Sequence, residues 1–131
     1  RSSTGGATGA RMKAASVSSD GNWTSFPPHE HQDMLEEAYL YIDMPAPQWG
    51  IQMVYTSAET PEFVHIVRDG DAVLMPAGYH PNVAAPGHAI NFIWMMAARE
   101  VEDRNREVAL LPCGKAKAGV PLVEVVDPRH A

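Results

Sequence analysis

The stretch HEHQDMLEE at residues 29–37 and the stretch GDAVLMPAGYHP at residues 70–81 decide how the chain folds. Side chains alternate between the two faces of an extended strand, so His29 and His31 point the same way. A glutamate near the end of the first stretch can return to that face, and His80 supplies a third imidazole from a distant part of the chain. Three imidazoles and one carboxylate suit a divalent first-row metal ion. The two stretches together predict a metal site built on β-strands.

Two adjacent glutamates compete for the carboxylate position. The spacing after His31 favours Glu36, whereas the register of the strand that continues through residues 37–41 favours Glu37. Neighbouring side chains on a strand point to opposite faces, so only one of the two can face the metal. Both stay candidates for the ligand, and the one that does not bind the metal is a candidate general base.

The composition excludes several classes of protein. The chain has 131 residues, of which 45% are hydrophobic, enough for one domain with a core. Its net charge of −6 gives no reason to expect a nucleic acid or an anionic membrane as partner. A single cysteine, Cys113, excludes an intramolecular disulfide and fits a cytoplasmic location. No apolar run approaches the roughly 20 residues of a membrane-spanning helix.

The chain divides into a domain and two tails. Residues 1–20 are rich in glycine, serine, alanine and threonine, which predicts a flexible N-terminal tail. The globular domain is expected over residues 21–126 and a C-terminal tail over residues 127–131. Eleven prolines and ten glycines separate short β-rich runs, which favours a β-sandwich or barrel. The expected strands cover residues 37–43, 50–56, 62–67, 73–75, 79–84 and 89–96, with a last strand or arm at 120–126.

The order and spacing of the site residues resemble the short form of the cupin signature. Glycine-containing turns bound the second part of the motif, and they give the backbone the positive-φ positions that place a last ligand opposite the histidine pair. The last histidine comes one residue earlier than the usual spacing. The resemblance implies an all-β fold, a single cupin with a double-stranded β-helix or jelly-roll barrel. In chain order the matching residues are His29, His31, Glu36, Gly70, Pro76, Gly78 and His80.

Residues 20–98 are similar to the KduI/IolB family of sugar-acid isomerases. The family resembles a double cupin that carries its metal in the second cupin, and this chain corresponds to that half. The resemblance implies a divalent metal, zinc before manganese, iron or nickel, held by the three histidines and by Glu36 or Glu37, with Glu37 favoured. The most specific matching segments are residues 21–23, 25–29, 35–37, 54–56 and 78–81.

The resemblance implies a metal-dependent aldose–ketose isomerase acting on a deoxy-uronate such as 5-deoxy-glucuronate, in inositol catabolism. Such a reaction moves a weakly acidic proton between adjacent carbons, so it needs a polarised carbonyl and a general base. Beside the glutamates, Tyr79 is a candidate catalytic residue. Gln52, Tyr55 and Arg68 are candidate contacts to the hydroxyls or the carboxylate of the substrate. Each of these four residues can equally be structural, because they lie on expected strands.

Two other functions stay open. A non-catalytic single cupin would bind a sugar or a small acid, and Met53, where the family tends to carry a basic residue, favours this reading. A metal-dependent cupin oxygenase would use the same ligands with iron or manganese. For each function the expected partner is a small sugar acid or a similar molecule. A homodimer is also expected, through the apolar face around residues 92–96.

Overall fold

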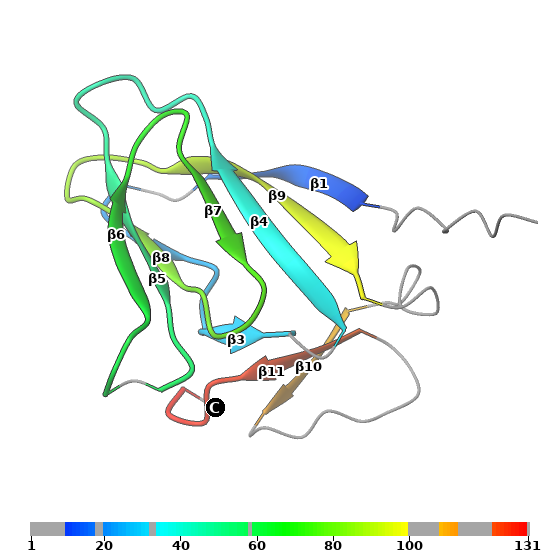
Figure 1. Cartoon of the computed structure of the whole chain (residues 1–131). Helices are drawn as coiled ribbons and strands as arrows, with labels where there is room; N and C mark the ends of the chain where they lie inside the picture. Colours follow the sequence, from blue (N-terminus) through cyan, green and yellow to red (C-terminus); the bar gives the residue numbers. More distant parts are fainter. Residues whose placement is uncertain are drawn as a thin grey trace, which may run out of the picture.

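The computed structural model describes residues 10–17, 20–31, 34–57, 59–99, 108–112 and 122–130, and Figure 1 shows how they are arranged. Every regular element in this part of the chain is a strand, and none of it is a helix that could cross a membrane. Cys113 lies outside the described residues. The strands are β1 Ala10–Val17, β2 Trp23–Thr24, β3 His29–Glu30, β4 Leu35–Tyr41, β5 Gly50–Val54, β6 Phe63–Val67, β7 Ala72–Met75, β8 Asn82–Ala84, β9 Asn91–Ala98, β10 Val108–Pro112 and β11 Leu122–Val126.

The strands form two four-stranded sheets and a smaller third sheet. One sheet has the order β1-β9-β4-β7, the second has the order β2-β8-β5-β6, and the third has the order β10-β11-β3. Figure 1 shows the two larger sheets side by side, with β3, β11 and β10 across one end of them. All pairs of these strands are antiparallel except β10 with β11. The predicted single cupin of the all-β class is therefore confirmed.

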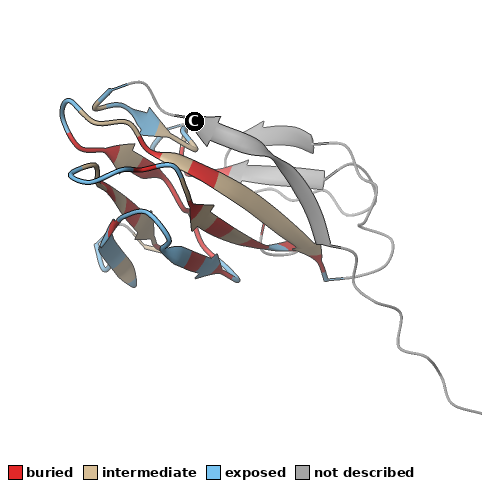
Figure 2. Ribbon diagram, turned by 90° about the horizontal axis from the view of Figure 1, so that it is seen from above, coloured by how far each residue is buried: buried red, intermediate tan, exposed pale blue. Residues whose placement is uncertain are grey.

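Strand β4 shows how the sequence builds the core. Its residues alternate between buried and more exposed positions, as a strand with one face in the core requires. Tyr39 and Tyr41 pack on Phe92 of β9, with ring centroids 4.3 and 5.5 Å apart. The same banding of buried and exposed residues is visible along the strands in Figure 2. The buried cluster contains Tyr39, Tyr41, Met44, Val67, Val73, Met75, Ala84, Ile90 and Phe92.

Both predicted tails contribute to the fold. Ala10–Val17 forms β1, which pairs with β9 from Ala10 opposite Ala97 to Val17 opposite Asn91. Composition missed this strand because pairing along an open sheet edge uses the backbone and needs few large apolar side chains. At the other end Asp127 is buried, and its backbone N–H donates to the carbonyl of Pro28 over 2.8 Å. Asp127, the first residue of the predicted C-terminal tail, is thus bonded to the residue directly before β3.

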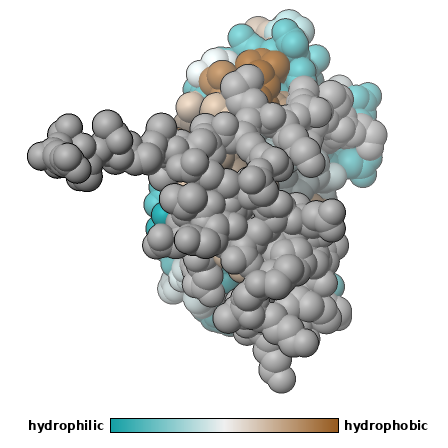
Figure 3. All heavy atoms as spheres, turned by 90° about the vertical axis from the view of Figure 1, so that its right-hand side faces the viewer, coloured by the Kyte–Doolittle hydropathy of each residue, from teal (hydrophilic) through white to brown (hydrophobic). Residues whose placement is uncertain are grey.

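The outer face formed by β4, β7 and β9 carries several aliphatic side chains. Leu74 is 76% exposed, and it lines a shallow hollow of about 310 Å³ together with Ala38, Met95 and Ala97. Strongly hydrophobic residues also reach the surface near the top of the view in Figure 3. Within the apolar stretch 92–96 that was predicted to form a dimer face, Phe92 is only 1% exposed and belongs to the core, because it lies on the inward face of β9.

A glycine fixes the path of the chain just before the last predicted ligand. Gly78 has φ +96°, and a Cβ there would lie 3.0 Å from the carbonyl oxygen of Tyr55. The backbones of Tyr55 and Tyr79 exchange two hydrogen bonds at this point, of 3.0 and 2.9 Å. Only glycine therefore lets the segment that carries His80 lie directly against the end of β5.

We expect Gly78→Ala to destabilise the protein more than Gly70→Ala. Gly70 has φ +84°, but a Cβ added there would meet no atom of the described residues within 4 Å. Its alanine variant should therefore lose only about 1–2 kcal/mol through backbone strain. At Gly78 the clash with Tyr55 should add roughly 1–3 kcal/mol. Urea unfolding of the two variants measures the difference, and equal stabilities would contradict it.

Candidate metal centre

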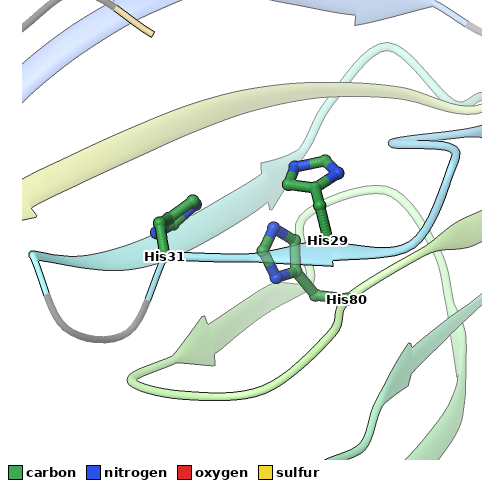
Figure 4. Close-up of side chains that lie close together, drawn as sticks. All are labelled: His29, His31 and His80. Atoms are coloured by element: carbon green, nitrogen blue, oxygen red, sulfur yellow. The ribbon is translucent and has the colours of Figure 1, made fainter. Parts of the chain in front are cut away.

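Three histidines from two parts of the chain gather in one place. His29 lies on β3, His31 follows directly after it, and His80 lies just before β8. One ring nitrogen of each lies within 4.8 Å of the corresponding nitrogens of the other two. The ring centroids are 4.9 Å apart for His29 and His80 and 5.2 Å apart for His31 and His80. Figure 4 shows the rings grouped together, and the site could hold a metal ion.

Glu37 brings a carboxylate to two of these rings. Its Oε2 lies 2.8 Å from Nε2 of His31 and 2.9 Å from Nε2 of His80, and all three side chains are buried. Two ligands about 2.1 Å from one zinc ion lie roughly 3.0–3.4 Å apart, so these separations are close to those of neighbouring ligands. The geometry favours Glu37 at the carboxylate position that the sequence left open.

Glu36 points away from the histidines. It lies on the outer face of β4, its side chain is 52% exposed, and its Oε1 is 3.0 Å from the guanidinium of Arg99. The alternation of side chains along the strand puts Glu36 and Glu37 on opposite faces. The prediction that Glu36 serves as a base in the site is therefore not supported by its position.

Backbone carbonyls fix the orientation of two of the rings. Nδ1 of His29 is 2.9 Å from the carbonyl oxygen of Pro27, and Nδ1 of His80 is 2.9 Å from that of Gly78. A carbonyl oxygen only accepts, so each Nδ1 must carry a hydrogen. In the neutral ring the lone pair is then on Nε2, the nitrogen through which such a histidine binds a metal.

The site has an excess of electron pairs that a cation would balance. Nδ1–H of His80 donates to the carbonyl of Gly78, so in the neutral ring the lone pair of Nε2 points at the Glu37 carboxylate. The lone pair and the carboxylate repel each other unless a proton or a metal ion lies between them. Nδ1 of His31 is buried without a hydrogen-bond partner among the described residues. Burial raises the pKa of Glu37, but hydrogen bonds and charge from His31 and His80 lower it further, to about 2. An ionised carboxylate beside imidazoles is a donor set that fits a divalent metal.

The C-terminal strand holds the histidine strand in place. Val126 and Val125 of β11 pair with His29 and Glu30, so β3 is not left as an isolated two-residue segment. Just beyond, the Asp127 carboxylate accepts hydrogen bonds from the hydroxyl of Tyr55 over 2.8 Å and from Arg129. The Arg129 guanidinium holds the pKa of Asp127 well below its usual range. No local pattern predicts the contact of Asp127 with Tyr55, because it joins residues 72 positions apart.

Comparison with known protein families identifies the family of the chain. A model of the KduI/IolB family matches residues 12–110. The chain belongs to the KduI/IolB family. The resemblance predicted from its motifs is therefore confirmed.

Relatives within the KduI/IolB family are longer than this chain. The 5-deoxy-glucuronate isomerase of Geobacillus kaustophilus is 38% identical over 85 residues, 60% of this chain and 31% of that protein. The enzyme of the same name from Shouchella clausii is 37% identical over 84 residues, 59% of this chain and 31% of that protein. The chain thus spans about a third of the length of these curated relatives.

A solved structure supports the fold. The crystal structure of an IolB-like protein from Salmonella typhimurium LT2 aligns with a TM-score of 0.62 and 23% identity. The alignment covers 89% of this chain and 40% of that one. At this identity the match supports the shared fold and nothing finer.

Two of the predicted substrate contacts, Gln52 and Arg68, have other partners or positions in the structure. Gln52 is 0% exposed, and its amide is hydrogen-bonded to Tyr41 and to three backbone carbonyls, so it has a structural role in place of the predicted contact. Arg68 is exposed in the turn between β6 and β7, where its backbone N–H donates to Asp71 over 2.8 Å. Figure 1 shows this turn at the opposite end of the barrel from β3.

Tyr55 and Tyr79 lie together in a hollow that none of the three clustered histidines lines. Their rings are 5.4 Å apart, and both line this hollow with Asp127 and Arg129. Burial is the main cause that raises the pKa of both phenols, and the charge of Asp127 adds to it. Both therefore stay protonated near neutral pH and can donate hydrogen bonds.

Tyr39 is a residue of the site's surroundings that the sequence reasoning missed. It faces inward two residues after Glu37, its ring centroid is 6.0 Å from that of His80, and its hydroxyl is 2.7 Å from Oγ of Ser25. The available signal was its position: side chains two apart on a strand share a face.

In the metal-free protein we expect Glu37 to contribute to stability in a pH-dependent way. Its folded pKa of about 2 lies below the ordinary value of 4.5, so its contribution is complete above pH 4.5 and is lost as the pH falls toward 2. The stability gap between wild type and Glu37→Gln should therefore shrink over this range, on the order of 3 kcal/mol at most. Urea unfolding across this range measures the gap, with exposed Glu36→Gln as the control. A gap that stays constant would contradict the expectation.

Proposed function

We propose that this chain is the metal-bearing cupin of an aldose–ketose isomerase acting on a deoxy-uronate similar to 5-deoxy-glucuronate, in inositol catabolism. The observation that carries the proposal is the cluster of His29, His31 and His80, of which His31 and His80 also contact the Glu37 carboxylate. The names of relatives in the KduI/IolB family support the reaction class. The single cysteine of the chain fits a cytoplasmic enzyme.

The four clustered side chains would hold the metal. Three neutral imidazoles and one carboxylate suit zinc first, with manganese, iron or nickel as alternatives. A bound divalent ion supplies Lewis acidity, which polarises a carbonyl and stabilises the negative charge that develops when a neighbouring proton is removed. His29 and His80 would be presented through Nε2, because their Nδ1 atoms donate to Pro27 and Gly78.

Other residues would bind and orient the substrate. Tyr79 and Tyr55 are protonated phenols, so we assign them hydrogen bonds to the substrate rather than the role of a base, and the hydroxyl of Tyr79 is the one assigned to donate to a hydroxyl or carboxylate oxygen. Tyr55 already donates to Asp127, which leaves its oxygen as an acceptor for a sugar hydroxyl. Burial of the cluster excludes water, which strengthens each of these interactions.

The decisive test compares His80→Ala with His65→Ala. The wild-type chain should bind about one zinc ion, and His80→Ala should weaken binding by more than the roughly 10–100-fold typical for loss of an outer partner. His65 is exposed and stacks on Phe63, with centroids 4.5 Å apart, so its alanine variant should bind zinc normally. Calorimetry measures zinc affinity, and conversion of 5-deoxy-glucuronate measures activity.

The same measurements separate the rival functions. Full turnover by His80→Ala would refute the isomerase assignment. Iron as the native metal together with oxygen consumption would favour the oxygenase. Binding of a sugar acid with no turnover would favour the non-catalytic cupin.

We also propose that two copies of the chain associate through the aliphatic outer face of β4, β7 and β9. Leu74 is 76% exposed there, beside Ala38 and Met95. Large exposed aliphatic side chains at a sheet edge favour association. Leu74→Lys should convert a dimer into a monomer in light scattering at micromolar concentration, whereas Val64→Lys on exposed β6 should leave the dimer intact. A monomeric wild type would refute this proposal.

A further inference from the structure

A fully buried polar cluster lies on three strands and is hydrogen-bonded to the backbone of His80. Tyr41 on β4, Gln52 on β5 and Asn82 on β8 are each 0% exposed. The hydroxyl of Tyr41 donates to Oε1 of Gln52 over 2.6 Å, and Nδ2 of Asn82 donates to that hydroxyl over 2.8 Å. A buried polar group that loses its partner costs about 1–3 kcal/mol, so aliphatic residues would fill this space at lower risk. The cluster therefore calls for a reason beyond core packing.

The hydrogen bonds of Gln52 reach the backbone of the predicted ligand. Its Nε2 donates to the carbonyl oxygens of His80 over 3.0 Å, of Pro81 over 3.2 Å and of Met53 over 2.9 Å. Pro81 has no N–H, so its backbone pairs with β5 only through its carbonyl oxygen, which accepts from the N–H of Met53 over 3.1 Å. The Gln52 side-chain amide adds a hydrogen-bond donor to the carbonyls of His80 and Pro81, which both precede the first residue of β8.

In the hydrogen bonds that link Asn82, Tyr41 and Gln52 to the backbone, donors and acceptors can be assigned in only one way. Carbonyl oxygens only accept, so the nitrogen of the Gln52 amide must face His80 and Pro81, and its oxygen must face Tyr41. Because Asn82 donates to the hydroxyl oxygen of Tyr41, the hydroxyl hydrogen is directed to Gln52. Glutamate, which has no amide hydrogens, and apolar residues of the same size cannot replace Gln52 in this role.

We propose that Gln52, oriented by Tyr41 and Asn82, is a positioning residue that sets the backbone of His80 and thereby aims its Nε2 at the metal. The ring is then held at two points, since Nδ1 donates to Gly78 while Gln52 fixes the carbonyl of the same residue. The inference rests on the metal centre of the proposed function. It assigns no contact between Gln52 and metal or substrate.

The test uses Gln52→Met, which keeps the size of the side chain and removes its donors. Metal affinity measured with Zn²⁺ should fall about 10–100-fold, as for the loss of other outer partners of a ligand. With Co²⁺ as the probe, the visible spectrum should change in position or intensity because His80 is displaced. Nitrogen NMR of the metal-free variant should show that His80 no longer keeps its hydrogen on Nδ1 alone.

Val67→Ala is the matched control for a purely structural effect. Val67 is 2% exposed on β6 and belongs to the apolar core cluster. Its loss should lower stability and leave the Zn²⁺ affinity and the Co²⁺ spectrum unchanged. Equal affinities and spectra for Gln52→Met and Val67→Ala would overturn the proposal.

Two further variants keep the outcome unambiguous. If Gln52→Met does not fold, Tyr41→Phe removes only the hydroxyl that orients the amide, and it should still weaken Zn²⁺ binding several-fold; unchanged binding would overturn the proposal. His80→Ala distinguishes failure of the proposed metal centre from failure of the positioning role of Gln52. If His80→Ala binds Zn²⁺ as tightly as wild type, the metal centre itself is wrong. If only His80→Ala loses Zn²⁺ and Gln52→Met does not, the metal centre stands and the positioning role fails.

Discussion

The contact between the Glu37 carboxylate and the imidazoles of His31 and His80 is the interaction on which the rest of this barrel depends. Separations of 2.8 and 2.9 Å bring a buried negative charge to two nitrogens that come from different parts of the chain. An isolated buried carboxylate would be strongly unfavourable, and a shared cation is the simplest way to balance it. Each of the three sheets brings one of these residues to the site, because Glu37 lies on β4, His31 follows β3 and His80 precedes β8.

Backbone hydrogen bonds from outside the site hold each ligand segment. The short strand β3 is supported by β11 and by the N–H of Asp127, while the segment of His80 is supported by Tyr55 and by the Gln52 amide. Metal sites commonly need such outer partners, because they fix the ring orientation before the ion binds. In this cupin the buried polar residues of the described interior lie in the site or in the hydrogen bonds that support it, and the rest of that interior is aromatic and aliphatic.

Local patterns predicted the parts of the site that follow from alternation along a strand. The histidine pair, the distant His80 and the choice limited to Glu36 or Glu37 all came from spacing. Spacing did not predict Tyr39, although it shares a face with Glu37, and it did not decide which residues of the apolar stretch 92–96 face the core. Gln52 was a candidate contact to the substrate, but the partners of its amide nitrogen are backbone carbonyls that a sequence does not reveal.

The sequence by itself determined the all-β class, the family and the residue types of the site, because these depend on short-range periodicity and motif spacing. Only the tertiary structure decided which glutamate faces the histidines, since strand register settles a choice between neighbours. It also decided that residues 10–17 and Asp127 belong to the barrel, because sheet-edge pairing and long-range hydrogen bonds join segments that are far apart in the chain.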